Sequence, residues 1–167
     1  MERTITYLEM TEPGQLRPGR VVPGLALRRT DSTSPLVRTL TARIGTPYGW
    51  RSAARTPEQW DEWLAHPLRR YWVITTQDET AGFTALEPQA DGDLRITTFG
   101  LLPEYVGRGL GGHALTLALR QAWATEAVGA PRVRRVWLST NNRDHPNALR
   151  NYEARGMRPF RTETRQD

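Results

Sequence analysis

Residues 101–112 read LLPEYVGRGLGG, and this stretch joins a predicted strand to the most regular helix that the sequence predicts. Four of its last six residues are glycines. Glycine opens backbone angles closed to other residues and lets a bulky ligand approach main-chain N–H groups. Those groups lie at the start of a helix, where unpaired donors and the positive end of the helix dipole favour a diphosphate. Because Arg108 adds a full positive charge, the stretch predicts a pyrophosphate-binding turn.

The elements on either side of this turn follow from the spacing of apolar residues. From Leu115 to Trp123 the apolar positions recur at offsets of 0, 3, 4, 7 and 8, which is one face of an α-helix. Before the turn, three apolar runs separated by turn residues predict an antiparallel meander. These runs are residues 71–76, 82–86 and 94–102. After the helix we expect a strand over 133–140, a short helix over 146–155 and a last strand over 157–164.

Two further helices are predicted ahead of the meander. Residues 56–59 read TPEQ, in which the threonine as N-cap, the proline after it and the glutamine three residues on form a capping box. A helix over 57–65 is therefore expected. An earlier helix is expected to be capped by Asp31 or Ser32 and to run to about Ile44. The resulting order of elements predicts an α/β fold, a mixed sheet with helices on both faces.

The length of 167 residues suits one well-buried core, so residues 1–167 are expected to form a single domain. Proline and glycine recur in residues 1–24, which are expected to be an irregular N-terminal extension, although residues 4–10 also fit a short strand. No apolar run reaches the length of a membrane span, and the first ten residues have no apolar signal core. The chain is therefore expected in the cytoplasm, without a membrane partner.

Composition excludes several classes of enzyme. All 23 basic residues are arginine, so no lysine is present for a P-loop, a Schiff base or an anchored pyridoxal cofactor. The absence of cysteine excludes a thiol nucleophile, a disulfide and a thiolate zinc site. Three scattered histidines without helical spacing argue against a metal site. The remaining chemistry uses backbone donors, carboxylates, histidine, serine or tyrosine.

The net charge of +5 and the pI near 10.4 have two explanations. One is an anionic partner, either a nucleic acid or a phosphorylated cofactor. The other is a set of solvated arginines without a binding role. The densest basic cluster is only Arg132, Arg134 and Arg135. A nucleic-acid partner is therefore not favoured.

Two other interpretations of the glycine-rich turn remain open on the residues alone. Gly107, Gly109 and Gly112 also satisfy the G-x-G-x-x-G spacing of dinucleotide-binding domains. That fingerprint requires an early βαβ unit and an acidic residue at the end of the next strand, whereas here the next predicted strand ends in Ser-Thr-Asn at 139–141. The turn can also be a structural one with no ligand, at a cost in conformational entropy.

The turn resembles the acetyl-CoA-binding motif of the GNAT superfamily, in which a Q/R-x-x-G-x-G/A sequence follows a Pro-Glu strand end. Gly109 and Gly111 match the two small positions, and Val106 departs from the motif at its Q/R position. The resemblance implies that acetyl-CoA binds here. The residues that it assigns to this site are Leu101, Leu102, Val106, Gly107, Arg108, Gly109, Leu110, Gly111, Gly112 and Tyr152.

Residues 148–157 read ALRNYEARGM and are similar to the second GNAT signature, A-x-x-x-Y-x-x-x-G-F. In that family the helix tyrosine lies near the sulfur of coenzyme A and often serves as general acid, and Tyr152 is its match. Met157 replaces the usual Phe, and His145 stands where the family commonly has Asn. Together the signatures cover residues 94–160 and imply the family fold, a central mixed, mostly antiparallel sheet flanked by helices.

The resemblance implies acetyl transfer from acetyl-CoA to a primary amine of a small molecule, without a metal. Since an acyl-cysteine is impossible, direct attack within a ternary complex is favoured. Tyr152 is expected to protonate the leaving sulfur, and a backbone N–H near Leu102 to polarise the carbonyl. His145 is the first candidate for the general base, with the alternative that it only caps the next helix. Glu87, Glu104 and a water relay are the other candidates.

The family fold also implies that the strands ending at Leu102 and near Ser139 splay apart to admit pantetheine. The region that lines the acceptor site in relatives corresponds here to the segment with Trp50, Trp60 and Trp63. These tryptophans are either ordinary core residues or the walls of an apolar acceptor pocket.

After Gly156 only 11 residues remain, which is room for one strand where relatives usually have two. Either the strand at 4–10 or a second subunit of a homodimer is expected to fill that place. Two alternatives to acetylation of a small amine also stay open. One is a GNAT-fold enzyme with another acyl-CoA, a protein N-terminus or a tRNA-borne aminoacyl group as substrate. The other is a non-catalytic module that binds coenzyme A or nucleic acid.

Overall fold

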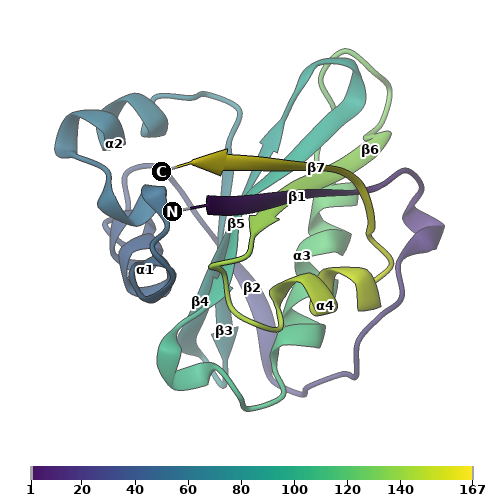
Figure 1. The fold of residues 1–167 in the computed structure, drawn as a ribbon. Helices are drawn as coiled ribbons and strands as arrows, with labels where there is room; N and C mark the ends of the chain where they lie inside the picture. Colours follow the sequence, from purple (N-terminus) through teal and green to yellow (C-terminus); the bar gives the residue numbers. More distant parts are fainter. Residues whose placement is uncertain (1, 167) are drawn as a thin grey trace.

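Seven strands form one sheet in the order β2-β3-β4-β5-β6-β1-β7 (Figure 1). The computed structural model describes residues 2–166. The strands are β1 (Glu2–Met10), β2 (Leu25–Thr30), β3 (Arg70–Thr76), β4 (Glu79–Pro88), β5 (Asp93–Leu101), β6 (Arg135–Asn141) and β7 (Arg158–Gln166). The pair β5 and β6 is parallel, and the other neighbouring pairs of these strands are antiparallel. The expected mixed, mostly antiparallel sheet is confirmed.

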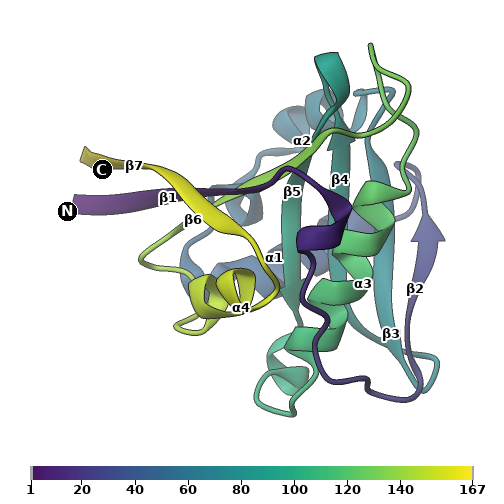
Figure 2. The same cartoon turned by 90° about the vertical axis from the view of Figure 1, so that its right-hand side faces the viewer.

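Helices cover both faces of the sheet. They are α1 (Leu36–Gly45), α2 (Pro57–Leu64), α3 (Gly111–Trp123) and α4 (Ala148–Ala154). Figures 1 and 2 show α1 and α2 on one face, and α3 and α4 on the other. Leu40 and Phe83 belong to the apolar cluster under α1 and α2, and Leu94 and Leu119 to the cluster under α3. Within residues 2–166, no helix combines the length and the apolar character that crossing a bilayer requires.

Several predicted elements are confirmed in detail. The runs before the turn form the meander β3-β4-β5, with antiparallel pairing between neighbours in sequence. The capping box of α2 is also present. Thr56 Oγ1 accepts the N–H of Gln59 at 3.2 Å, and Gln59 Oε1 accepts the N–H of Thr56 at 2.9 Å.

Two helices begin later than the sequence predicts. Asp31 does not cap α1, because its Oδ1 accepts the N–H of Thr33 at 2.8 Å in a tight turn, and α1 begins only at Leu36. α4 begins at Ala148, whose N–H donates to the carbonyl of His145 at 2.9 Å. In both cases a turn occupies residues that were expected in the first turn of the helix.

The N-terminal segment is not irregular throughout, which corrects the expectation for residues 1–24. Glu2–Met10 is strand β1, and it lies between β6 and β7. Leu8 lies opposite Leu138 in β6 and opposite Pro159 in β7. Its side chain is buried, as an apolar residue inside a sheet is expected to be. The sheet is therefore completed by the chain's own strand, and it needs none from a second subunit.

We expect Leu8→Ala to lower the free energy of unfolding by about 2–5 kcal/mol, because truncating a buried leucine leaves a cavity. Leu8 lies in the second half of β1 and is 0% exposed. Urea denaturation followed by circular dichroism measures the change. Val21→Ala is the control, since Val21 is 68% exposed, and it should change the value by less than about 0.5 kcal/mol. An unchanged midpoint for Leu8→Ala would contradict the placement of β1 inside the sheet.

The strands β5 and β6 lie side by side only at their beginnings. Their parallel pairing joins residues 93–95 to residues 135–137, and no further pairs follow along the described strands. The strands therefore separate well before either of them ends. This is the splay that the family fold implied, and it leaves backbone edges of both strands open to a ligand.

Candidate functional site

The glycine-rich turn lies between β5 and α3, as the sequence predicts. A short 3-10 turn, Pro103–Tyr105, follows β5, and the chain then passes through two glycines in the left-handed region. Gly107 and Gly109 have φ angles of +82° and +76°, which strain other residues, β-branched ones most. A Cβ at either position would meet no protein atom within 4 Å. These glycines therefore give the turn its shape and keep its surface clear.

The amide N–H groups of this turn are free to bind a ligand. Within the described chain, no backbone N–H of residues 107–113 donates a hydrogen bond to a protein acceptor. The helix α3 that follows has no side-chain cap. Unpaired amides at the start of a helix favour an anion such as a diphosphate. The geometry thus fits the ligand that the sequence predicts.

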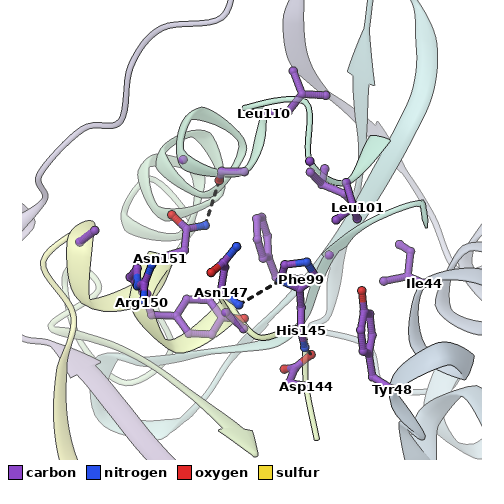
Figure 3. A pocket seen from close by; sticks show the side chains of 18 of the residues that line it. Ile44, Tyr48, Phe99, Leu101, Leu110, Asp144, His145, Asn147, Arg150 and Asn151 are labelled. Carbon is purple, nitrogen blue, oxygen red and sulfur yellow. Dashed lines mark hydrogen bonds between the residues drawn. The ribbon is translucent and has the colours of Figure 1, made fainter. Parts of the chain in front are cut away.

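A cavity of 440 Å³ runs from the turn to α4 (Figure 3). On one side lie the end of β5 and the turn, and on the other the start of α4 and the loop before it. The predicted site residues that line this cavity are Leu101, Val106, Gly107, Gly109, Leu110, Gly111, Gly112, His145 and Tyr152. We call it the turn cavity. Leu102 and Arg108 are not among the residues that line it.

Leu102 is buried, and its N–H donates to the carbonyl of Ala81 at 2.8 Å. This N–H is therefore not available to polarise a substrate carbonyl. Residues of antiparallel strands alternate between hydrogen-bonded and non-hydrogen-bonded pairs. Leu101, which lies opposite Gly82, consequently directs its own N–H and C=O away from β4, toward the gap beside β5. The free backbone donor near Leu102 is that of Leu101.

The positive charge of the turn cavity comes from α4 and its C-terminal end. The guanidinium of Arg108 lies over the ring of Tyr105, 4.9 Å from its centroid, whereas Arg150 and Arg155 line the cavity. The Nε of Arg155 is buried and has no hydrogen-bond partner in the part of the chain that the structure describes. Sequence reasoning missed both arginines, because only the fold brings α4 beside the turn.

Tyr152 lies where the turn cavity meets a second cavity of 280 Å³, which opens between β5 and β6. Tyr152 is 6% exposed, and its ring packs against Phe99 with 6.4 Å between ring centroids. No hydrogen bond among residues 2–166 involves its hydroxyl. Burial, followed by the negative charge of Asp144, raises the pKa of Tyr152 above its ordinary value. The phenol therefore keeps its proton at neutral pH.

His145 lines the turn cavity but is engaged as a cap at the start of α4. Its Nδ1 accepts the N–H of Asn147 at 3.0 Å (Figure 3), and its ring stands edge-on to Tyr48 at 5.8 Å between centroids. A neutral imidazole that accepts at Nδ1 carries its proton on Nε2. In this arrangement neither nitrogen has a free lone pair. The geometry favours the capping interpretation of His145 over the role of general base.

Asp144 is a carboxylate that the sequence analysis missed, and it lines both cavities. Its Oδ1 accepts the indole N–H of Trp50 at 3.2 Å and the N–H of His145 at 2.9 Å. Its Oδ2 accepts the hydroxyl of Thr140 at 2.7 Å. A carboxylate offers about four acceptor positions, so these three bonds leave one position, on Oδ2. Asp144 lies in the loop between β6 and α4, and only the fold brings it to the two cavities.

The two glutamates considered as bases lie outside both cavities. Glu87 forms an ion pair with Arg69 at 2.8 Å, and Glu104 forms an exposed one with Arg43 at 2.7 Å. Of the three tryptophans considered for the acceptor pocket, Trp50 lines both cavities, and the other two pack with the apolar cluster under α1 and α2. Residues 2–166 contain no group of three or more His, Cys, Asp or Glu placed to hold a metal ion.

The surroundings of the turn also separate it from a dinucleotide-binding domain. That domain places its glycine motif in an open sheet of parallel strands. Here the strand before the turn, β5, is the last of an antiparallel meander and is parallel only to β6. The glycine spacing alone therefore does not indicate a nicotinamide cofactor.

Comparisons with known proteins agree with this fold. The structure is similar to a GCN5-related N-acetyltransferase from Kribbella flavida, with a TM-score of 0.64 and 20% identity, covering 96% of this chain and 56% of that chain. A GCN5-related N-acetyltransferase from Sphaerobacter thermophilus has a TM-score of 0.63 and 19% identity, covering 96% of this chain and 49% of that one. A tandem GNAT protein from the clavulanic acid biosynthesis pathway has a TM-score of 0.61 and 18% identity, covering 98% of this chain and 53% of that one.

The chain thus spans about half the length of these three structures. No curated protein sequence matches it. A model of the Acetyltransferase (GNAT) family matches residues 37–157, a range that contains the turn, β5, β6 and α4. The chain therefore belongs to the GNAT family of acetyltransferases.

Proposed function

We propose that this protein moves an acetyl group from acetyl-CoA to a primary amine by direct attack within a ternary complex. One observation carries the proposal. Residues 107 and 109–112, whose amides are unpaired, line a cavity that Tyr152 also lines. A ligand with a diphosphate at one end and a reactive group at the other fits such a site.

The residues present suit coenzyme A. The turn amides and the buried Nε of Arg155 are donors for the diphosphate, and charge-assisted bonds of this kind are the stronger ones in proteins. The open backbone edge of β5 at Leu101 offers a donor and an acceptor for the amides of the pantetheine arm. When bound, acetyl-CoA supplies the acetyl group as a thioester.

In the transfer, the amine nitrogen bonds to the acetyl carbon while the carbon–sulfur bond breaks. The nitrogen loses one proton, and the sulfur leaves as a thiolate that takes up a proton from solvent. The N–H of Leu101 is the backbone donor available to the carbonyl oxygen. Tyr152 donates a hydrogen bond to the sulfur as negative charge develops there. The pKa of Tyr152 is raised above its ordinary value, whereas an ordinary thiol has a pKa of about 8.5. The proton therefore stays on Tyr152, and the hydrogen bond stabilises the thiolate.

The proton of the amine leaves toward Asp144 or a water molecule bound to it. Asp144 has an acceptor position left on Oδ2, and both Asp144 and Tyr152 line the two cavities where these meet. His145 takes this role only if its bond to Asn147 breaks. Asp144→Asn and His145→Gln separate the two candidates, because only the residue that receives the proton should affect turnover beyond its effect on stability.

The test is release of free thiol from acetyl-CoA by purified protein, with and without a panel of amines. We expect release that depends on the amine, and the acetylated amine in mass spectrometry. Replacing the donor by propionyl-CoA or succinyl-CoA tests other acyl groups, and a peptide N-terminus in the panel tests a protein acceptor. Calorimetric binding of acetyl-CoA without turnover would instead support a non-catalytic module.

Because burial and Asp144 raise the pKa of Tyr152 above 10, its hydroxyl stays protonated up to that pH. We therefore expect kcat at saturating substrates to show no falling limb from Tyr152 between about pH 7 and 9.5. Stopped assays across this range, with buffer and ionic strength held constant, measure the profile. A falling limb near pH 9 that disappears in Tyr152→Phe would contradict this prediction.

A further inference from the structure

The second cavity, of 280 Å³, has an unusual distribution of charge. It lies in the gap between β5 and β6, with the beginning of β1 and the end of β7 on one side and the segment after α1 on the other. Four arginines and a single carboxylate line it: Arg3, Arg51, Arg95, Arg165 and Asp144. We call it the acceptor cavity, because it joins the turn cavity at Tyr152 and lies beyond it.

Arg95 is the side chain on which the inference depends. Its guanidinium stacks over the ring of Trp137 at 4.6 Å, and its Nε is buried without a hydrogen-bond partner among residues 2–166. Leaving a buried charged donor unpaired is costly. The rigid stacking holds the planar group ready for a ligand that accepts its hydrogen bonds.

The carboxylates that could neutralise Arg95 within the chain are already taken. Glu87 lies opposite Arg95 in the β4–β5 pairing, but it is bonded to Arg69 at 2.8 Å. Asp93, two residues earlier on the same strand, is bonded to Arg135 at 3.3 Å. In the described chain no carboxylate forms an ion pair with Arg95. Its charge is therefore available to a bound molecule.

The other side of the acceptor cavity also carries more positive than negative charge. Arg165 pairs with Glu163 at 2.7 Å, but that carboxylate also receives Arg161 at 3.0 Å and the hydroxyl of Tyr7 at 2.5 Å. Two guanidinium groups thus share one carboxylate. Such a surplus attracts anions and repels polycations such as polyamines.

From these contacts we infer that the amine acceptor carries an anionic group, a phosphate or a carboxylate, and that Arg95 binds this group in the acceptor cavity. The amine end lies toward Asp144 and Tyr152, at the junction with the turn cavity. The anionic end lies toward Arg95, whose planar fork matches either anion with two parallel hydrogen bonds. This inference rests on the proposed acetyl transfer and adds the class of its acceptor.

Matched pairs of amines test the inference. Glucosamine 6-phosphate against glucosamine tests a phosphate, and 4-aminobutyrate against butylamine tests a carboxylate. We expect the anionic member of at least one pair to have a kcat/KM at least ~10-fold higher, and to bind the complex of the protein with CoA more tightly in calorimetry. The pair that shows the preference identifies which anion the site takes.

Arg95→Gln should reduce that preference to less than ~3-fold, by lowering kcat/KM for the anionic member more than for the neutral one. Arg95→Lys should restore part of it, because the charge returns without the planar fork. Arg132→Gln is the control, since Arg132 is exposed and lines neither cavity, and it removes the same charge. Thermal unfolding of each variant shows whether the fold is intact.

The outcomes distinguish this inference from the proposed function. Neutral amines acetylated as well as their anionic partners would overturn the inference and leave the acetyltransferase activity in place. Anionic amines that bind the CoA complex no more tightly than neutral ones would overturn it as well. Failure of the protein to bind acetyl-CoA in calorimetry would instead count against the proposed function itself.

Discussion

Valine in place of Gly109 is expected to raise the Kd for acetyl-CoA at least ~100-fold. The φ angle of +76° is unfavourable for a β-branched residue, and the new side chain would extend over the amides that point out of the turn. Losing two hydrogen bonds to a charged phosphate removes about 3–6 kcal/mol, and each 1.4 kcal/mol is a factor of about ten in Kd. Isothermal titration calorimetry measures the change.

Gly111→Val separates obstruction of the ligand from strain in the backbone. Gly111 does not have a positive φ, and a Cβ there would lie 3.6 Å from Asn151 Nδ2, an ordinary contact. We therefore expect Gly111→Val to keep its melting temperature and still lose most of its affinity. Gly14→Val is the control, because Gly14 has open space around it and lies outside both cavities. Full affinity in both Gly109→Val and Gly111→Val would refute the diphosphate site.

Tyr152→Phe is expected to lower kcat by ~100-fold and to leave the Kd for acetyl-CoA within ~3-fold of the original value. The hydroxyl stabilises charge that develops on the sulfur only during the reaction, so its loss affects the transition state and not the bound substrate. Pre-steady-state measurement of thiol release gives the rate of the chemical step, and calorimetry gives the affinity.

The fold should tolerate this change. The Tyr152 hydroxyl has no hydrogen bond to another described residue, and phenylalanine keeps the packing of its ring against Phe99. The free energy of unfolding should therefore change by less than about 1 kcal/mol. Tyr105→Phe is the control, because Tyr105 is bonded to Glu79 at 2.9 Å and lies outside both cavities. Equal turnover in Tyr152→Phe and the original protein would remove Tyr152 from the reaction.

The sequence predicted most of the fold because its signals are local. The signals are the capping box at Thr56, the apolar stripe of α3 and the three runs of the meander. Each of them depends on residues that lie close together in the sequence. The place of β1 could not be predicted in this way. Its partners β6 and β7 lie at the other end of the sequence, so residues 4–10 predicted a strand but did not decide whether it or a second subunit completes the sheet.

In the candidate site, too, the local features were predictable and the others were not. The turn was predictable because its glycines are contiguous and adjoin a strand and a helix. The direction of a side chain or of one N–H group is not encoded locally. Arg108 stacks on Tyr105, and the N–H of Leu102 pairs with β4, so the free backbone donor near Leu102 is that of Leu101. Arg155 and Asp144 line the turn cavity only because the fold brings α4 and the loop before it beside the turn.

The position of β1 has a consequence for the order in which the molecule assembles. The meander β3-β4-β5 can form from neighbouring segments, but β1 must wait for both of its neighbours, which are the last two strands of the chain. Pairing of segments so distant in sequence is slow, because a long loop must close first. The strands that carry Arg3 and Arg165 consequently pair last, so the glycine-rich turn between β5 and α3 can form before this side of the acceptor cavity does.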